Sequence, residues 1–201
     1  MSAQERTISE QEISALRKNA SEKLKSKIYR VKMIYESWNI NSSAPDRLIN
    51  ITTEYLPDRY HNIIEIKTVD GTSHEEAIKI GKRKFVKWNN EAWKELSPAK
   101  ANDEGDLISL PVAIEVTVEC KYLGKRVINN QNADLYEIKT TKKYKFYERV
   151  FIPIYTERFW FNQDGLFLKT ESETELNNKT SHTIDEYEYD PKDQKIEAPI
   201  K

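Results

Sequence analysis

The chain has 201 residues, and its 32 Lys and Arg residues almost balance its 33 Asp and Glu residues, which leaves a formal net charge of −1. Charged residues make up 32% of the sequence and no run of about 20 apolar residues occurs, so a transmembrane helix is excluded. The 4 Trp, 11 Tyr and 6 Phe residues exclude a disordered chain, and the single cysteine excludes an internal disulfide.

Residues 7–24 are predicted to form the one clear α-helix, within an N-terminal helical region at 1–25. Ser9 and Glu12 have the spacing of a capping box, in which the serine hydroxyl accepts a backbone N–H from the first turn. The apolar positions that follow at helical spacing are Ile13, Leu16, Ala20 and Leu24. Because these positions share one face, we expect the helix to lie across an apolar surface.

Residues 26–200 are predicted to form an antiparallel sheet of about eight to ten strands. From Ser26 onward the hydrophobic pattern has a period of two, and isoleucine outnumbers leucine, which is typical of strands. The turn dipeptides Asp70-Gly71, Asn89-Asn90 and Asp164-Gly165 separate consecutive runs, so neighbouring strands should form hairpins. The predicted fold class is therefore mainly β (α+β), a curled antiparallel half-barrel with the N-terminal helix packed on it.

Two long strands show the alternation most clearly, at residues 112–122 and 134–147, with a chain reversal predicted at 121–132. The apolar positions on one face of the first strand are Val112, Ile114, Val116, Val118, Cys120 and Tyr122. Those on one face of the second strand are Tyr136, Ile138, Tyr144 and Phe146. We expect this face to be buried and the opposite, polar face to be wet. Residues 97–111 have loop composition, and we interpret them as a surface loop or lid inside a single domain that spans 1–201.

The residues predict no catalytic, metal or cofactor site. His61, His74 and His182 are far apart in the sequence, whereas a transition-metal site needs several converging donors. Glu171, Glu173 and Glu175 share a strand face, where cross-strand lysines are simpler partners than a calcium ion. No nucleophile motif is present, so a hydrolase stays open only as a site assembled from residues distant in the sequence.

The basic and aromatic segment at 142–149 does not predict nucleic-acid binding. In a strand, Lys143 and Lys145 point away from Tyr144 and Phe146, so bases stacked on the rings could not also place their phosphates at these lysines. The net charge of −1 also opposes binding to a polyanion.

The amount of apolar strand surface exceeds what one helix can cover. A helix of about 18 residues is about 27 Å long and about 10 Å wide, which is too narrow to fill the concave side of a curled sheet of this size. The sheet therefore either closes on its own side chains or keeps an apolar cavity, and the residues alone leave both possibilities open.

Several short segments carry a resemblance to a known family. They are Pro57-Asp58-Arg59-Tyr60-His61, Ile78-Lys79-Ile80-Gly81, Trp88-Asn89-Asn90-Glu91-Ala92-Trp93, Phe159-Trp160, Asp164-Gly165-Leu166 with Lys169, Tyr187-Glu188-Tyr189-Asp190 and Ile196-Glu197-Ala198-Pro199. With the leading helix, they resemble bacterial extracytoplasmic proteins of the lipoprotein-carrier (LolA/LppX-like) half-barrel group. The resemblance implies an apolar cleft that receives acyl chains, a periplasmic or cell-surface location and no catalytic residue.

We therefore predict a non-enzymatic protein that binds or carries a lipid acyl chain or another apolar ligand on the concave face of the half-barrel. The predicted ligand-binding residues are Met33, Tyr35, Val116, Val118, Tyr136, Ile138, Tyr144 and Phe146. The alternative is an envelope interaction or scaffold module with a packed core, which docks another envelope protein through Trp88, Trp93 and Trp160.

Overall fold

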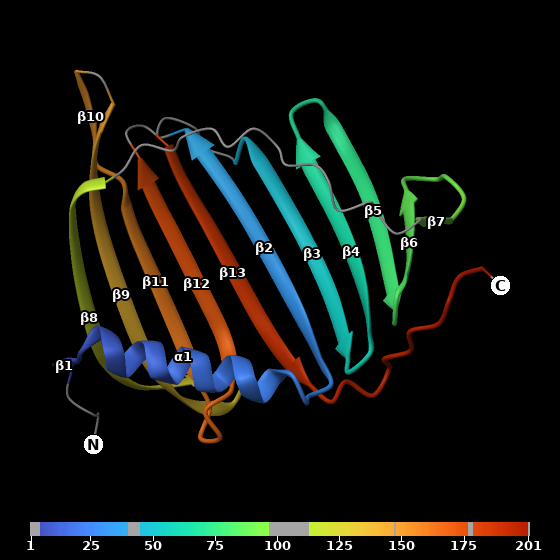
Figure 1. Ribbon diagram of the computed structural model, residues 1–201, viewed down its shortest axis with the longest axis horizontal. Helices are drawn as coiled ribbons and strands as arrows, with labels where there is room; N and C mark the ends of the chain where they lie inside the picture. Colours follow the sequence, from blue (N-terminus) through green and yellow to red (C-terminus); the bar gives the residue numbers. More distant parts are fainter. Residues whose placement is uncertain (1–4, 40–44, 97–112, 147, 177–178, 201) are drawn as a thin grey trace.

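The computed structural model describes residues 5–39, 45–96, 113–146, 148–176 and 179–200. These residues form one α-helix and thirteen strands that belong to a single antiparallel sheet (Figure 1). The helix is α1 (Glu10–Leu24). The strands are β1 (Arg6–Thr7), β2 (Tyr29–Asn39), β3 (Arg47–Leu56), β4 (Arg59–Thr68), β5 (Gly71–Ile80), β6 (Arg83–Trp88), β7 (Lys94–Leu96), β8 (Ala113–Ile128), β9 (Gln131–Phe146), β10 (Arg149–Phe151), β11 (Ile154–Phe161), β12 (Phe167–Leu176) and β13 (Lys179–Tyr189).

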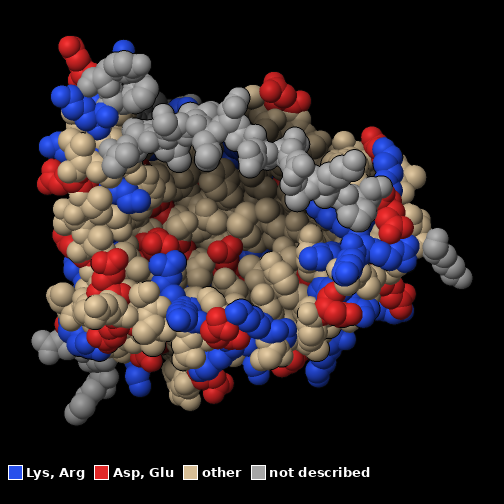
Figure 2. Space-filling view, viewed as in Figure 1, with Lys and Arg blue, Asp and Glu red and all other residues tan. Residues whose placement is uncertain are grey.

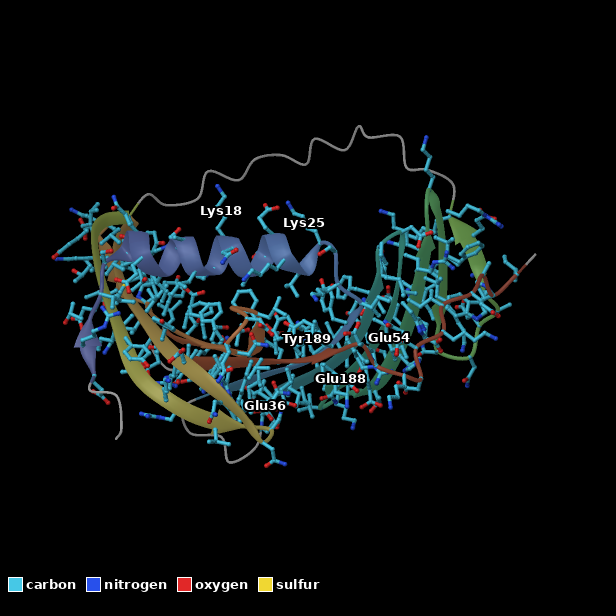
Figure 3. All side chains as sticks on the ribbon, turned by 90° about the horizontal axis from the view of Figure 1, so that it is seen from below. Lys18, Lys25, Glu36, Glu54, Glu188 and Tyr189 are labelled. Atoms are coloured by element: carbon cyan, nitrogen blue, oxygen red, sulfur yellow. The ribbon has the colours of Figure 1, made fainter. Side chains whose placement is uncertain are left out.

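The sheet is long, curled and open. Its strand order is β1-β8-β9-β11-β12-β13-β2-β3-β4-β5-β6-β7, with β10 paired to β9, and its two end strands do not pair with each other. Figure 3 shows the sheet bent into a trough with α1 inside the curve. The predicted fold class is confirmed. Ten strands have six residues or more, as many as the upper limit of the prediction, and the sequence pattern missed the two- and three-residue strands β1, β7 and β10.

Helix α1 begins where the capping box predicts. The Ser9 hydroxyl accepts a hydrogen bond from the Glu12 backbone N–H at 3.1 Å, and Glu10 is the first helical residue. The prediction began the helix at residue 7, but Arg6 and Thr7 pair with β8 as strand β1. The Ile8 backbone N–H donates to the Cys120 carbonyl at 3.1 Å, so the chain leaves the sheet just before it enters the helix.

One hydrophobic core lies between α1 and the inner, concave face of the sheet. Ile13 and Ala20 of the helix are completely buried against strands β8, β9, β11 and β12. The buried residues of this core are Ile8, Ile13, Ala20, Cys120, Ile138, Phe159, Phe161 and Phe167. Figures 1 and 3 show the helix crossing only the end of the trough that runs from β8 toward β13. Burial in this core raises the pKa of the Cys120 thiol. The predicted packing of the helix on an apolar surface is confirmed.

A second core lies on the outer, convex face of the sheet, under residues 190–200. Phe85 is completely buried and packs with Ile78 and Ile196. The Arg59 Nη1 atom donates to the Ile196 carbonyl at 3.2 Å, and Arg30 pairs with Asp193 at 2.9 Å. The C-terminal segment is thus held on the face opposite the helix, which leaves the inner face of β2–β6 without a helical cover among the described residues.

The hairpins follow the predicted turn residues with small differences. Residues 89–90 and 164–165 form turns between paired strands, as expected, whereas the first hairpin turns at 69–70, one residue earlier than predicted, and Gly71 begins β5. The reversal predicted at 121–132 is a tight turn at Asn129 and Asn130, which both have positive φ, so β8 continues to Ile128. Gly124, with φ +89, lies at a register shift of the β8–β9 ladder rather than in a turn. The predicted loop or lid at 97–111 lies outside the described residues.

Candidate ligand-binding face

The inner face of the trough has three zones that the strand register defines. Residues directly opposite each other in an antiparallel ladder point to the same face of the sheet. Starting from the residues that face the helix, the pairing partners on each successive strand therefore give the other residues of the inner face. The first zone lies at β8, β9 and β11 beside the helix. The second, here called the inner polar band, comprises Thr170, Ser172, Thr174, Ser181, Thr183 and Asp185 of β12 and β13. The third, the inner apolar floor, comprises Met33, Tyr35, Ile49, Ile51, Ile64 and Ile66 of β2, β3 and β4.

The first zone contains a pocket of about 320 Å³ beside the first turns of α1. Val116, Val118 and Ile138 provide its apolar wall, and Ile13 contributes from the helix. The prediction that the even positions of β8 are all buried is wrong for this part of the strand. Val116 is 53% exposed and Val118 is 36% exposed, whereas Cys120 is 4% exposed, because the helix packs over Cys120 and leaves the earlier residues open.

Charged side chains line the rim of this pocket. The Arg17 guanidinium pairs with Glu157 at 3.5 Å and lies 4.6 Å from the centroid of the Phe159 ring. Lys142 lies over the Tyr155 ring at 5.2 Å, and it lines this pocket and a second one of about 280 Å³. The two pockets share Lys142, Glu157 and Thr140, so the hollow continues from β8 across β9 and β11 toward the inner polar band.

The inner polar band contains a half-buried carboxylate without a cationic partner. The Asp185 Oδ2 atom accepts a hydrogen bond from the Thr170 hydroxyl at 2.8 Å. No Lys or Arg side chain in the described part of the chain forms an ion pair with Asp185. Burial raises the pKa of Asp185, and the Thr170 hydrogen bond opposes this shift. The pKa values of Tyr55 and Tyr187 are raised by burial and by the nearby Asp185 charge.

Replacing Asp185 with asparagine is expected to stabilise the fold at neutral pH. Because the pKa of Asp185 is higher in the folded state than the ordinary value of 3.8, the folded state binds more protons between the two values, and stability falls as the pH rises through that window. Asparagine removes this cost and can still accept the Thr170 hydrogen bond. Thermal unfolding should give a higher Tm for Asp185→Asn at neutral pH, and the difference should shrink as the pH falls through the raised pKa of the folded state and disappear below about 4. A gain that does not change with pH would contradict this origin.

The inner apolar floor lies on the other side of the band. Met33, Ile51 and Ile64 form one row across β2, β3 and β4, and Asp185 is directly opposite Met33 at the β13 end of this row. Tyr35, Ile49 and Ile66 form the next row, and all six side chains are partly exposed. Figure 2 shows that the middle of the concave face is hollowed and that its deep part is mostly uncharged.

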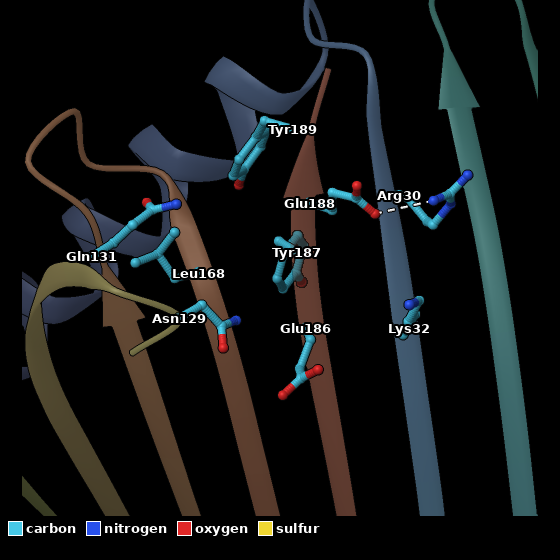
Figure 4. A pocket seen from close by; sticks show the side chains of 9 residues that line it. All are labelled: Arg30, Lys32, Asn129, Gln131, Leu168, Glu186, Tyr187, Glu188 and Tyr189. Carbon is cyan, nitrogen blue, oxygen red and sulfur yellow. Dashed lines mark hydrogen bonds and ion pairs between the residues drawn. The ribbon is translucent and has the colours of Figure 1, made fainter. Parts of the chain in front are cut away.

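A larger pocket of about 480 Å³ lies on the outer face and has a different character (Figure 4). Asn129 and Gln131 of the β8–β9 hairpin border it on one side, and Arg30 and Lys32 of β2 border it on the other. The Arg30 guanidinium already pairs with three carboxylates, of Glu54, Glu188 and Asp193. The charge of Arg30 is therefore compensated within the protein.

The eight predicted ligand-binding residues fall into two groups on the inner face. Met33 and Tyr35 belong to the inner apolar floor, whereas Val116, Val118 and Ile138 line the pocket beside the helix. Tyr136 packs in the helix-covered core, with its ring 5.7 Å from that of Phe161, and Tyr144 lies close to Tyr155. The side chain of Phe146 lies outside the described part. Strands β11, β12 and β13 separate the two groups, so together they span the trough rather than one pocket.

Sequence reasoning missed the inner polar band and its Asp185. The signal was present, because Thr183, Asp185 and Tyr187 alternate with Ile184 and Glu186 along β13. The period of two places these three positions on one face, but only the register with β2 shows that this is the inner face.

The other residues considered as sites lie elsewhere. Glu171 points outward and has Lys169 and Arg158 as partners, at 2.5 Å and 3.7 Å. Within the described ranges, no group of three or more His, Cys, Asp or Glu residues is arranged to hold a metal ion. Trp88 and Trp93 lie at the β6–β7 end of the sheet, whereas Trp160 lies on β11, so these tryptophans do not form one contiguous docking patch.

Comparison with known proteins finds a distant structural likeness. No protein-family model and no curated protein matches the chain. Among solved structures, the chain is similar to the crystal structure of a LolA superfamily protein from Nitrosomonas europaea, with 10% sequence identity, a TM-score of 0.30, and coverage of 87% of this chain and 90% of that chain. This neighbour belongs to the superfamily that the sequence resembles, and a similarity of this size does not assign the chain to it. Among the described residues, no helix combines the length and apolar character needed to cross a bilayer.

Proposed function

We propose that this protein binds an elongated apolar ligand, such as a lipid acyl chain, in the trough of its half-barrel, without catalysing a reaction on it. The observation that carries the proposal is the unequal cover of the inner face. Helix α1 covers one end, while Val116 stays 53% exposed beside it and the inner apolar floor is partly open. A periplasmic or cell-surface location, expected from the resemblance, remains a prediction.

The physical basis of binding is desolvation of apolar surface on both partners. Each buried CH₂ group contributes about 0.8 kcal/mol, so an acyl chain needs no specific polar contact to be held. The pocket of about 320 Å³ beside α1 falls at the lower end of the size range of ligand sites, and the neighbouring pocket of about 280 Å³ extends it. A chain lying along the trough would therefore contact apolar walls at both ends and the inner polar band between them.

The test uses a neutral fluorescent probe, phenylnaphthylamine, and a charge placed in the apolar wall. The wild-type protein is expected to bind the probe with an increase in fluorescence. Val118→Lys should weaken probe binding about tenfold, because the probe would then displace water from an ammonium group. Fluorescence titration measures both dissociation constants, and circular dichroism confirms that the variant is folded.

Thr117→Lys provides the matched control. Thr117 is the preceding residue of β8 and points to the opposite face, so the variant has the same added charge outside the trough. Its probe affinity should stay within about twofold of the wild-type value. Absence of probe binding to the wild-type protein would contradict the proposed function. Equal weakening by both variants would place the probe outside this pocket.

A further inference from the structure

We propose that Asp185 and the tyrosines around it form a subsite for a protonated amine, so that the preferred ligand is an amphiphile with an ammonium headgroup. This inference rests on the proposed function, because it assigns the headgroup position of the same trough. It is argued from the position of Asp185, from its missing counter-ion and from the aromatic rings beside it.

The position of Asp185 suits a headgroup whose chain lies on the inner apolar floor. Asp185 is directly opposite Met33, and Met33, Ile51 and Ile64 continue the same row across the sheet. Three strand spacings of about 4.8 Å separate Asp185 from Ile64, roughly 14 Å in all. An alkyl chain of about ten carbons can lie along this row with its polar end at Asp185.

The missing counter-ion makes Asp185 different from most other acidic side chains on the strands. On the outer face, Glu54, Glu76, Glu137 and Glu171 each pair with a Lys or Arg side chain. Asp185 is partly buried, and its described hydrogen-bond donor is the neutral Thr170 hydroxyl. Such a carboxylate interacts most strongly with a ligand that carries a positive charge, because the ion pair is partly shielded from water.

The tyrosine cluster beside Asp185 adds a second attraction for a cation. Tyr187, the next inward residue of β13, lies 6.5 Å from Tyr29, and Tyr29 stacks on Tyr55 at 4.5 Å between ring centroids. Tyr189 lies 6.4 Å from Tyr29. Tyr187 also stacks on Phe167 at 5.6 Å, so neighbouring rings cover Tyr29 and Tyr187 on both sides. Among the described ring contacts Tyr55 stacks on one side only, and its other face can attract an ammonium group through the ring quadrupole.

The experiment compares three ligands with the same ten-carbon chain and different headgroups. Decylammonium, decanol and decanoate are each titrated directly into the protein at neutral pH by isothermal titration calorimetry, because Asp185 lies four strand spacings from the probe pocket at Val118. The wild-type protein is expected to bind decylammonium about tenfold more tightly than decanol, and decanoate more weakly than decanol. In Asp185→Asn, decylammonium should lose about tenfold in affinity while decanol changes by less than about twofold.

Glu186→Gln is the matched control, because Glu186 is the adjacent residue of β13 and is exposed on the outer face. It removes one negative charge from the same strand and should keep the preference for decylammonium. Equal binding of decylammonium and decanol to the wild-type protein, or a preference that persists in Asp185→Asn, would overturn the ammonium subsite and leave the proposed function intact. If none of the three ligands binds the wild-type protein, the ammonium subsite is overturned, and if phenylnaphthylamine also fails to bind, the proposed function is overturned as well.

Discussion

Phe85→Ala is expected to lower the free energy of unfolding by about 3–5 kcal/mol, the usual cost of truncating a fully buried phenylalanine. Phe85 is 0% exposed and packs with Ile78 and Ile196 in the outer core. The Arg83 guanidinium lies 4.8 Å from the centroid of its ring, so this contact is lost as well. Urea denaturation followed by circular dichroism measures the change.

Val69→Ala is a suitable control for this measurement. Val69 is 87% exposed, so its truncation should change the unfolding free energy by less than about 0.5 kcal/mol. A loss below about 1 kcal/mol for Phe85→Ala would contradict the outer core. Probe binding in the trough should persist in folded Phe85→Ala, because Phe85 points to the face opposite the inner apolar floor.

The position of the outer core explains why the trough is open. At β5 and β6 the side chains of Ile78 and Phe85 face outward and are covered by the C-terminal segment around Ile196, while the neighbouring Val86, 2% exposed, is buried on the inner face. The helix covers inward-facing residues at the other end of the sheet. The helix and the C-terminal segment lie on opposite faces, and neither reaches the inner apolar floor of β2–β4. The side chains of this floor therefore stay partly exposed, and a ligand can pack against them.

Local sequence signals predicted the elements of this fold well. The capping serine Ser9, the alternation from Ile114 to Tyr122 and the turn at Asp164-Gly165 each act over a few residues, and each appears in the structure where it was expected. Alternation also divided the strand residues correctly between two faces. It could not tell which part of a face is covered, because the cover comes from residues distant in the sequence.

The candidate site shows this limit most clearly. Val118 and Cys120 have the same position in the pattern, yet only Cys120 lies under the helix. Met33 and Val116 were assigned to one site, although four strands lie between their strands, because the order β8-β9-β11-β12-β13-β2 depends on long-range pairing. Residues 190–200 carry no periodic pattern, so their role in covering Phe85 could not be predicted from the sequence.

The second large effect is expected at the helix. Ile13→Ala should lower the free energy of unfolding by about 2–5 kcal/mol, because Ile13 is 0% exposed and anchors α1 in the inner core beside Ile138 and Phe159. Lys18→Ala is the control within the same helix. Figure 3 shows Lys18 pointing away from the sheet, so this change should cost less than about 0.5 kcal/mol.

Ile13→Ala also tests how the helix and the trough are related. Ile13 lines the pocket of about 320 Å³ together with Val116, Val118 and Ile138, so its truncation enlarges the apolar space next to the proposed ligand. The variant should therefore lose stability and yet bind phenylnaphthylamine at least as tightly as the wild-type protein in fluorescence titrations below its unfolding transition. A parallel loss of probe affinity in the folded variant would show that the probe binds the Ile13 side chain itself. In that case the helix would be a wall of the binding site rather than a partial cover over it.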